Sequence, residues 1–196
     1  MKHGLLGIIL TPATGTRTIP GVPWCADNGC YTLGDRFDGD HYLRYLDKQP
    51  TGDVLFATAP DVVGDAVATL ERSADWYDRL VERGYPPALV AQDGIEDVMD
   101  QVPWGQIGAW FVGGTTAWKE STDASQCTQE AQRRGLWTHM GRVNSLRRLR
   151  IAARDGYDTV DGNYLAFGPD KNLPSLLRWM DEVNTQDALP FAEATF

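Results

Sequence analysis

Short apolar runs alternate with polar and amphipathic stretches along most of the chain. Seven such runs, each ending at a turn-forming or polar residue, occupy positions 5–10, 22–26, 53–59, 88–91, 107–112, 136–140 and 157–160. Most are apolar at successive positions, which is typical of parallel strands whose two faces are both covered. The pattern therefore predicts a parallel sheet of seven strands.

Helical periodicity fills several of the intervals between these runs. Apolar residues recur about every 3.6 positions over 62–83, and the ranges 122–134 and 144–154 have the same character. A further helix is expected over 173–183, with Asn172 as its cap.

This alternation predicts an α/β fold, and seven strand–helix units favour a barrel over an open sheet. A complete (β/α)8 barrel of the TIM type usually needs about 250 residues. The 196 residues therefore predict a compact or incomplete (β/α)8 barrel that forms one domain over 1–196. Only a weak run at 188–191 is available as an eighth strand.

The composition is that of an ordinary globular protein, with 42% hydrophobic and 23% charged residues. No apolar run reaches the roughly 18 residues of a membrane-spanning helix, and no signal-peptide cleavage site follows the N-terminal run. The three cysteines, Cys25, Cys30 and Cys127, do not form a disulfide framework and favour a reducing compartment. We expect a cytoplasmic protein without a membrane partner.

The net charge of −9 is unevenly distributed, because seven of the 18 basic residues are arginines between positions 133 and 154. No Asp or Glu interrupts that segment. It is either a solvated helix face or a surface that binds the phosphates of a nucleic acid. The candidate phosphate ligands are Arg142, Arg147, Arg148, Arg150 and Arg154.

Carboxylates, an amide and a glycine pair follow the predicted strands: Asp27, Asp61, Gln92, Gly113, Gly114 and Asp161. Because the carboxyl ends of barrel strands meet at one mouth, we expect these residues to lie together. A single Asp in such a place is usually a helix cap, but the whole set is harder to explain by capping. Carboxylates suit the N–H donors of a purine, and a glycine pair lets backbone amides approach a flat ring.

Five motifs also occur in the order found in the tRNA-guanine transglycosylase family. They are DNGCY at 27–31, QDG at 92–94, FVGG at 111–114, HMG at 139–141 and GYDTVD at 156–161. The resemblance covers about residues 22 to 165. The family has a (β/α)8 barrel and exchanges guanine in a polynucleotide for a 7-deazaguanine.

The resemblance implies that Asp161 is the nucleophile that attacks the sugar C1′, and that Asp27 is the acid and base for the leaving and incoming bases. A carboxylate stabilises the positive charge that develops at C1′ and can trap it covalently. Asp158 and Asp161 point to opposite faces of a strand, so only one can be the nucleophile. The resemblance selects Asp161 and leaves Asp158 a structural role.

The resemblance also implies a set of substrate-binding residues: Asp61, Gln92, Gly113, Gly114, Tyr31 and Met140. Asp61 and Gln92 would read the guanine edge, and the two glycines would present backbone amides to the base. Tyr31 either stacks on the base or packs within the protein. We interpret His139 as a hydrogen-bonded core residue.

The chain departs from the family in two ways. Members that act on tRNA carry a zinc site of three cysteines and a histidine, but no cysteine follows Cys127 here. We therefore expect no metal and no other cofactor, and the chain resembles the short members of bacteria and phages that modify DNA. Lys119 and Glu120 follow the glycine pair, where the family often has an acidic residue. If Lys119 faces the site, a cationic 7-substituent is disfavoured, and a neutral one, as in 7-cyano-7-deazaguanine, is favoured.

We therefore expect a glycosyltransferase (a pentosyltransferase) that replaces guanine in DNA with a 7-deazaguanine through a covalent Asp–sugar intermediate. Three alternatives stay open. The chain could act on tRNA, it could be an inactive nucleic-acid-binding subunit of a larger modification complex, or it could be an unrelated hydrolase with paired aspartates. Partner subunits or copies of the same chain also stay open, as does a phage origin with action in the host cytoplasm.

Overall fold

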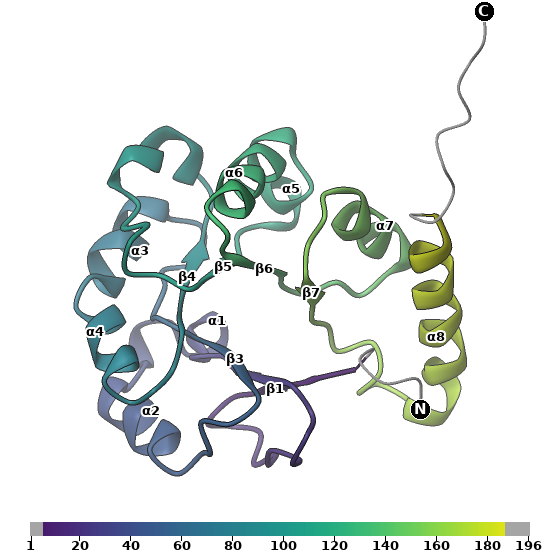
Figure 1. The fold of residues 1–196 in the computed structure, drawn as a ribbon, viewed down its shortest axis with the longest axis horizontal. Coiled ribbons are helices and arrows are strands. Elements are labelled where there is room, and N and C mark those ends of the chain that lie inside the picture. The colour runs from purple at the N-terminus through teal and green to yellow at the C-terminus, as the bar shows by residue number, and fades with distance from the viewer. Residues whose placement is uncertain (1–5, 187–196) are drawn as a thin grey trace, which may run out of the picture.

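The computed structural model describes residues 6–186, and its centre is an all-parallel sheet whose strands follow chain order. The strands are β1 (Ile8–Leu10), β2 (Trp24–Ala26), β3 (Val54–Thr58), β4 (Pro87–Ala91), β5 (Ala109–Val112), β6 (Trp137–Met140) and β7 (Thr159–Val160). The sheet curls into a half-barrel with helices on its outer side (Figure 1). Within residues 6–186, β7 does not pair with β1, so the barrel is open at that point. The α/β class and an incomplete barrel architecture are thus confirmed.

Helices connect the strands on the outside of the half-barrel. Between β2 and β4 these are α1 (Cys30–Leu33), η1 (Gly34–Arg36), α2 (Gly39–Leu46), α3 (Ala66–Ser73) and α4 (Trp76–Val81). The later ones are η2 (Ile95–Gln101), α5 (Thr116–Lys119), α6 (Thr122–Arg133), α7 (Leu146–Arg154) and α8 (Pro169–Gln186). In this part of the chain, no helix combines the length and the apolar character needed to cross a membrane.

Two helix predictions need correction. The single helix expected over 62–83 is two helices, because the backbone leaves helical geometry at Asp75 (ψ 3°). The first of them also begins later than expected, after its cap, Asp65. Asn172 does not cap the last helix, which begins earlier, at Pro169. The Asn172 side chain instead donates from Nδ2 to the Tyr164 carbonyl at 2.7 Å. The weak run at 188–191 lies outside the described residues.

Side chains of the strands alternate between two apolar layers, as the geometry of a strand requires. In β5, Trp110 and Val112 join the large cluster that packs against the outer helices. Ala109 and Phe111 belong to a smaller cluster with Phe56 that fills the inside of the half-barrel. The inner layer forms a floor, and the site lies above it at the carboxyl ends of the strands.

Candidate active site

A cavity of about 420 Å³ opens at the carboxyl ends of the strands. Residues from the ends of β2 to β7 line it, among them these predicted site residues: Asp27, Tyr31, Asp61, Gln92, Gly113, Gly114, Arg142 and Asp161. Met140, predicted to bind substrate, is not in the lining. It is fully buried and packs with Val143 and Leu149, because strand alternation turns its neighbours His139 and Gly141 inward and Met140 outward.

Asp27 follows β2 directly and is half-buried in the cavity wall. Its Oδ1 accepts a hydrogen bond from the Gly29 N–H at 2.7 Å, at the start of α1. Burial raises the pKa of Asp27 to about 6; the Gly29 N–H opposes this rise, and the charge of Asp161 adds to it. A carboxyl group with this pKa can hold or release a proton near neutral pH, as a general acid and base must.

Asp61 and Gln92 form a buried polar network that ties together the ends of β3, β4 and β5. Asp61 accepts from Asn28 Nδ2 at 3.0 Å and from Gln92 Nε2 at 2.7 Å, and burial raises its pKa. Gln92 Oε1 accepts from the N–H groups of Gly64 at 2.9 Å and Gly114 at 3.0 Å. These bonds fix the orientation of the Gln92 amide and leave it one N–H without a described partner.

The glycine pair supplies space to the cavity. A Cβ at Gly113 would lie 2.7 Å from Gln92 Nε2 and 2.7 Å from a methyl group of Val90. Gly114 has a φ of +52°, which glycine adopts easily. The two N–H groups donate to Ala91 O and Gln92 Oε1, so neither is free in this conformation to meet a base as expected.

Asp161 stands at the end of β7, and both described hydrogen bonds of its side chain fall on one carboxylate oxygen. Oδ1 lies 3.1 Å from His139 Nε2 and accepts from the Arg142 N–H at 3.3 Å. An ionised carboxylate only accepts, so a hydrogen bond between these two atoms requires the proton on His139 Nε2. The other ring nitrogen, Nδ1, lies 2.8 Å from the Thr159 hydroxyl. Oδ2 has no hydrogen-bond partner in the described structure, and the Asp161 side chain is 21% exposed.

His139 was expected in the core, but the sequence pattern does not connect it to Asp161. It is the core residue that was expected, since it is 3% exposed and stacks on Phe111 with ring centroids 4.7 Å apart. It also holds Asp161. The strand register explains this contact, because β6 and β7 pair His139 with Thr159, and Asp161 lies two residues beyond on the same face. The apolar pattern of the sequence does not fix that register.

Asp158 has the structural role that was predicted for it. Its Oδ2 accepts from the Thr138 N–H at 2.7 Å and from the Thr138 hydroxyl at 2.9 Å, which joins β6 and β7 on the face away from the site.

Arg142 and Tyr31 meet across the cavity. The guanidinium lies 4.4 Å from the centre of the Tyr31 ring and donates to the carbonyls of Gly113 and Gly114. Arg142 has a φ of +61°, which is uncommon for a residue other than glycine. Tyr31 is 63% exposed, so one face of a π-system is available at the cavity mouth.

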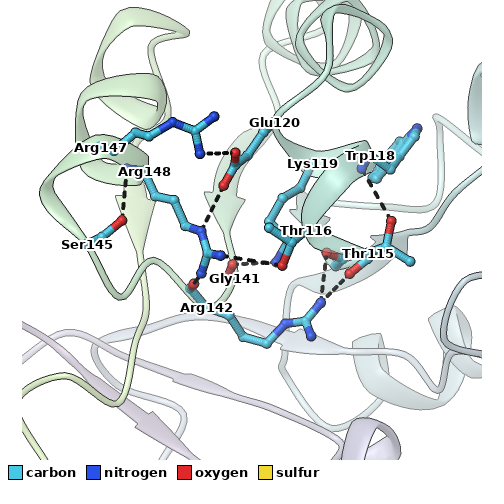
Figure 2. Close-up of polar contacts among 12 residues, drawn as sticks. Thr115, Thr116, Trp118, Lys119, Glu120, Gly141, Arg142, Ser145, Arg147 and Arg148 are labelled. Atoms are coloured by element: carbon cyan, nitrogen blue, oxygen red, sulfur yellow. Dashed lines mark hydrogen bonds and ion pairs between the residues drawn. The ribbon is translucent and has the colours of Figure 1, made fainter.

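The four arginines of α7 do not line the cavity, and each is paired with a carboxylate. Arg147 and Arg148 both bind Glu120 (Figure 2). The other two pairs are Arg150 with Glu182 at 2.6 Å and Arg154 with Asp155 at 2.7 Å. Arg147, Arg150 and Arg154 are exposed. However, the acidic partners that the segment lacks in sequence are supplied in space.

Lys119, and not Glu120, faces the interior. It is 2% exposed, and its Nζ donates to the Gly141 carbonyl at 2.7 Å (Figure 2). Burial lowers the pKa of Lys119 to about 7; Arg142 lowers it further, and Asp161 opposes the shift.

Within residues 6–186, no group of three or more His, Cys, Asp and Glu side chains is arranged to hold a metal ion. The three cysteines are free thiols. No protein-family model matches the sequence, and no curated protein does. The resemblance to the transglycosylases therefore rests on the motifs, each of which contributes at least one residue to the lining of one cavity.

Proposed function

We propose that the protein exchanges guanine in DNA for a 7-deazaguanine with a neutral 7-substituent. The observation that carries this proposal is the contrast between two carboxylates in one cavity. Asp161 is held on Oδ1 by His139 and the Arg142 N–H, with no partner for Oδ2 among residues 6–186, whereas Asp27 is held by the Gly29 N–H and has a pKa raised to about 6. Environments that differ in this way suit one carboxylate to attack and the other to proton transfer.

In the first step, Asp161 Oδ2 forms a bond to C1′ as the bond from C1′ to N9 of guanine breaks. The electron pair of that bond leaves with the base, and protonated Asp27 supplies the proton that makes the base neutral guanine. In the second step, the incoming 7-deazaguanine gives its N9 proton to Asp27 and attacks C1′. The Asp161 ester is then released as a carboxylate, so each step balances and no cofactor is consumed.

The cavity suits a flat, hydrogen-bonding base. Its volume lies within the range of small-molecule sites. Phe111 and Val90 offer apolar surface, and the exposed Tyr31 ring can cover a base. The free lone pairs of Asp61 can accept base N–H groups, and the remaining Gln92 N–H can donate to a carbonyl.

The cations near the glycine pair support a neutral substituent. Arg142 lines the cavity there, and Lys119 lies behind it, whereas Glu120 is turned away to bind arginines. An aminomethyl group at this wall would place another positive charge beside Arg142, and beside Lys119 while that side chain is protonated. A nitrile, as in 7-cyano-7-deazaguanine, avoids that repulsion. DNA is proposed over tRNA because the chain resembles the short members without zinc ligands.

An exchange assay tests the function. We expect DNA that contains guanine, incubated with the protein and 7-cyano-7-deazaguanine, to yield the modified deoxynucleoside by mass spectrometry. Parallel reactions use tRNA as the polymer and 7-aminomethyl-7-deazaguanine as the base, and both are expected to give less product. Exchange in tRNA alone would overturn the choice of DNA. Nucleic-acid binding without exchange in either polymer would favour the non-catalytic subunit.

A further inference from the structure

One peptide unit joins Lys119 to Asp161. The carbonyl of Gly141 accepts from Lys119 Nζ at 2.7 Å, and the N–H of the same peptide, on Arg142, donates to Asp161 Oδ1 at 3.3 Å. Lys119 comes from α5, after β5, whereas Asp161 ends β7. The Gly141–Arg142 peptide at the end of β6 thus bridges two elements that are not neighbours in the sheet.

The burial of Lys119 calls for an explanation, because a buried ammonium group is costly unless it is well paired. In the part of the chain that the structure describes, Gly141 O is its only hydrogen-bond partner, and no carboxylate oxygen lies within 4 Å of it. Glu120, the next residue, is bound to Arg147 and Arg148. The fold therefore keeps a cation inside the protein, directed at one carbonyl.

That carbonyl belongs to an unusual backbone segment. Arg142 has a φ of +61°, and a Cβ at Gly141 would lie 2.8 Å from the Phe111 ring, so the chain passes close to the cavity floor. A backbone in this region needs support from its surroundings. A cation on the carbonyl oxygen supplies support and also polarises the peptide, which strengthens the N–H bond at its other side.

We infer that Lys119 is a positioning residue: it holds the Gly141–Arg142 peptide so that the Arg142 N–H stays on Oδ1 of Asp161 and leaves Oδ2 for the reaction. The role of Oδ2 rests on the proposed function, whereas the link from Lys119 to Asp161 rests on the contacts alone. Lys119 acts through the peptide and has no need to touch the substrate.

This arrangement couples the two charges. The charges of Arg142, Arg148, Asp161 and Glu120 act on the Lys119 amine. Asp161 also interacts with His139 and with the charge of Asp27. With the pKa of Lys119 lowered to about 7, its charge is present in slightly acidic solution and is lost as the pH rises through 7. The hydrogen bond to Asp161 should weaken over the same range.

NMR on the full-length protein with labelled aspartate carboxyls tests the inference, and Asp161→Asn assigns the signal. In Lys119→Met, which keeps most of the length of the side chain but removes its charge, we expect the carboxyl resonance of Asp161 to shift, because the hydrogen bond from the Arg142 N–H weakens. The matched control is Lys48→Met, an exposed lysine, for which we expect no change. An unchanged Asp161 carboxyl resonance in Lys119→Met would overturn the inference.

A second measurement uses the unsubstituted protein, so that the test of the inference does not depend on Lys119→Met alone. The Arg142 amide nitrogen shift should follow the titration of the Lys119 amine, observed directly at Nζ. The same measurement on Asp27→Asn removes the contribution of Asp27, which titrates at a nearby pH. An Arg142 amide that does not respond to Lys119 also contradicts the coupling. If the coupling is present but no base exchange occurs, the proposed function is wrong and the positioning link stands.

Discussion

The cavity at the strand ends and the arginine helix α7 are both prominent in the sequence, but the fold treats them in opposite ways. In the cavity, some reactive atoms have no hydrogen-bond partner among residues 6–186, including Asp161 Oδ2 and one N–H of Gln92. On α7, each of the four arginines forms an ion pair with a carboxylate. Strand-end residues converge because the topology brings them together, whereas a charge run can be neutralised by residues far away in the sequence.

The largest expected effect comes from removing the proposed nucleophile. Asp161→Ala should lower base exchange by at least about 1,000-fold and abolish a denaturation-resistant adduct with DNA, because this carboxylate, held by His139 and the Arg142 N–H, is the one proposed to bond to C1′. Nucleic-acid binding should stay nearly unchanged. Adduct formation and binding are measured on gels, under denaturing and native conditions.

Asp158→Ala is the matched control on the same strand. It should keep the adduct but lower the free energy of unfolding by about 1–3 kcal/mol, because the buried Thr138 N–H loses its acceptor. An adduct that persists in Asp161→Ala and disappears in Asp158→Ala would show that the other aspartate is the nucleophile.

The second prediction concerns Asp27, whose function and stability effects should oppose each other. Its folded pKa of about 6 lies above the ordinary 3.8, so the folded state binds the proton more tightly than the unfolded state. This group therefore destabilises the fold as the pH rises from about 4 to 6, by about 3 kcal/mol in total at neutral pH. Asp27→Asn should remove that pH dependence and raise stability at pH 7.

The same substitution should lower exchange by about 100- to 10,000-fold, since an amide cannot transfer the proton. Urea unfolding at pH 4.5 and 7, together with the exchange rate, gives both quantities. A loss of stability at pH 7 would mean that the carboxylate has a structural role that its raised pKa does not suggest.

The third and smallest effect concerns α7. If its exposed arginines contact DNA phosphates, the double variant Arg147→Ala, Arg150→Ala should weaken binding to all sequences. It should also flatten the log–log salt dependence by about 0.9 for each lost contact. Binding titrations at several salt concentrations measure both. Unchanged affinity and slope would mean that α7 is a solvated, internally paired face.

Glu120→Gln tests the same ion pairs from the other side, because it changes the carboxylate and leaves the arginines in place. Because Glu120 holds Arg147 and Arg148, its neutralisation should free both and strengthen DNA binding a few-fold at low salt. Glu182→Gln, which frees Arg150 alone, should have a smaller effect. Weaker binding in Glu120→Gln would show that the pairs position the arginines for DNA instead of competing with it.

The order and type of the strands could be predicted because strands covered on both faces are continuous apolar runs, and their ends carry the site. The Lys119–Gly141 and His139–Asp161 contacts could not be predicted, since they depend on strand register and on the direction in which one side chain points. The pairing of Arg148 with Glu120 likewise joins positions 28 residues apart. The bend at Asp75 was missed because apolar periodicity continues through it.

The open side of the barrel has a consequence for motion. Each strand from β2 to β6 is held on both sides, whereas β7 has two residues and, among the described strands, a single neighbour. Local opening is easiest where few backbone bonds must break. The aspartate at the end of β7 thus stands at an edge of the sheet, where amide hydrogens should exchange sooner than those of the doubly held β2, beside Asp27. The two carboxylates would then differ in rigidity as well as in acidity.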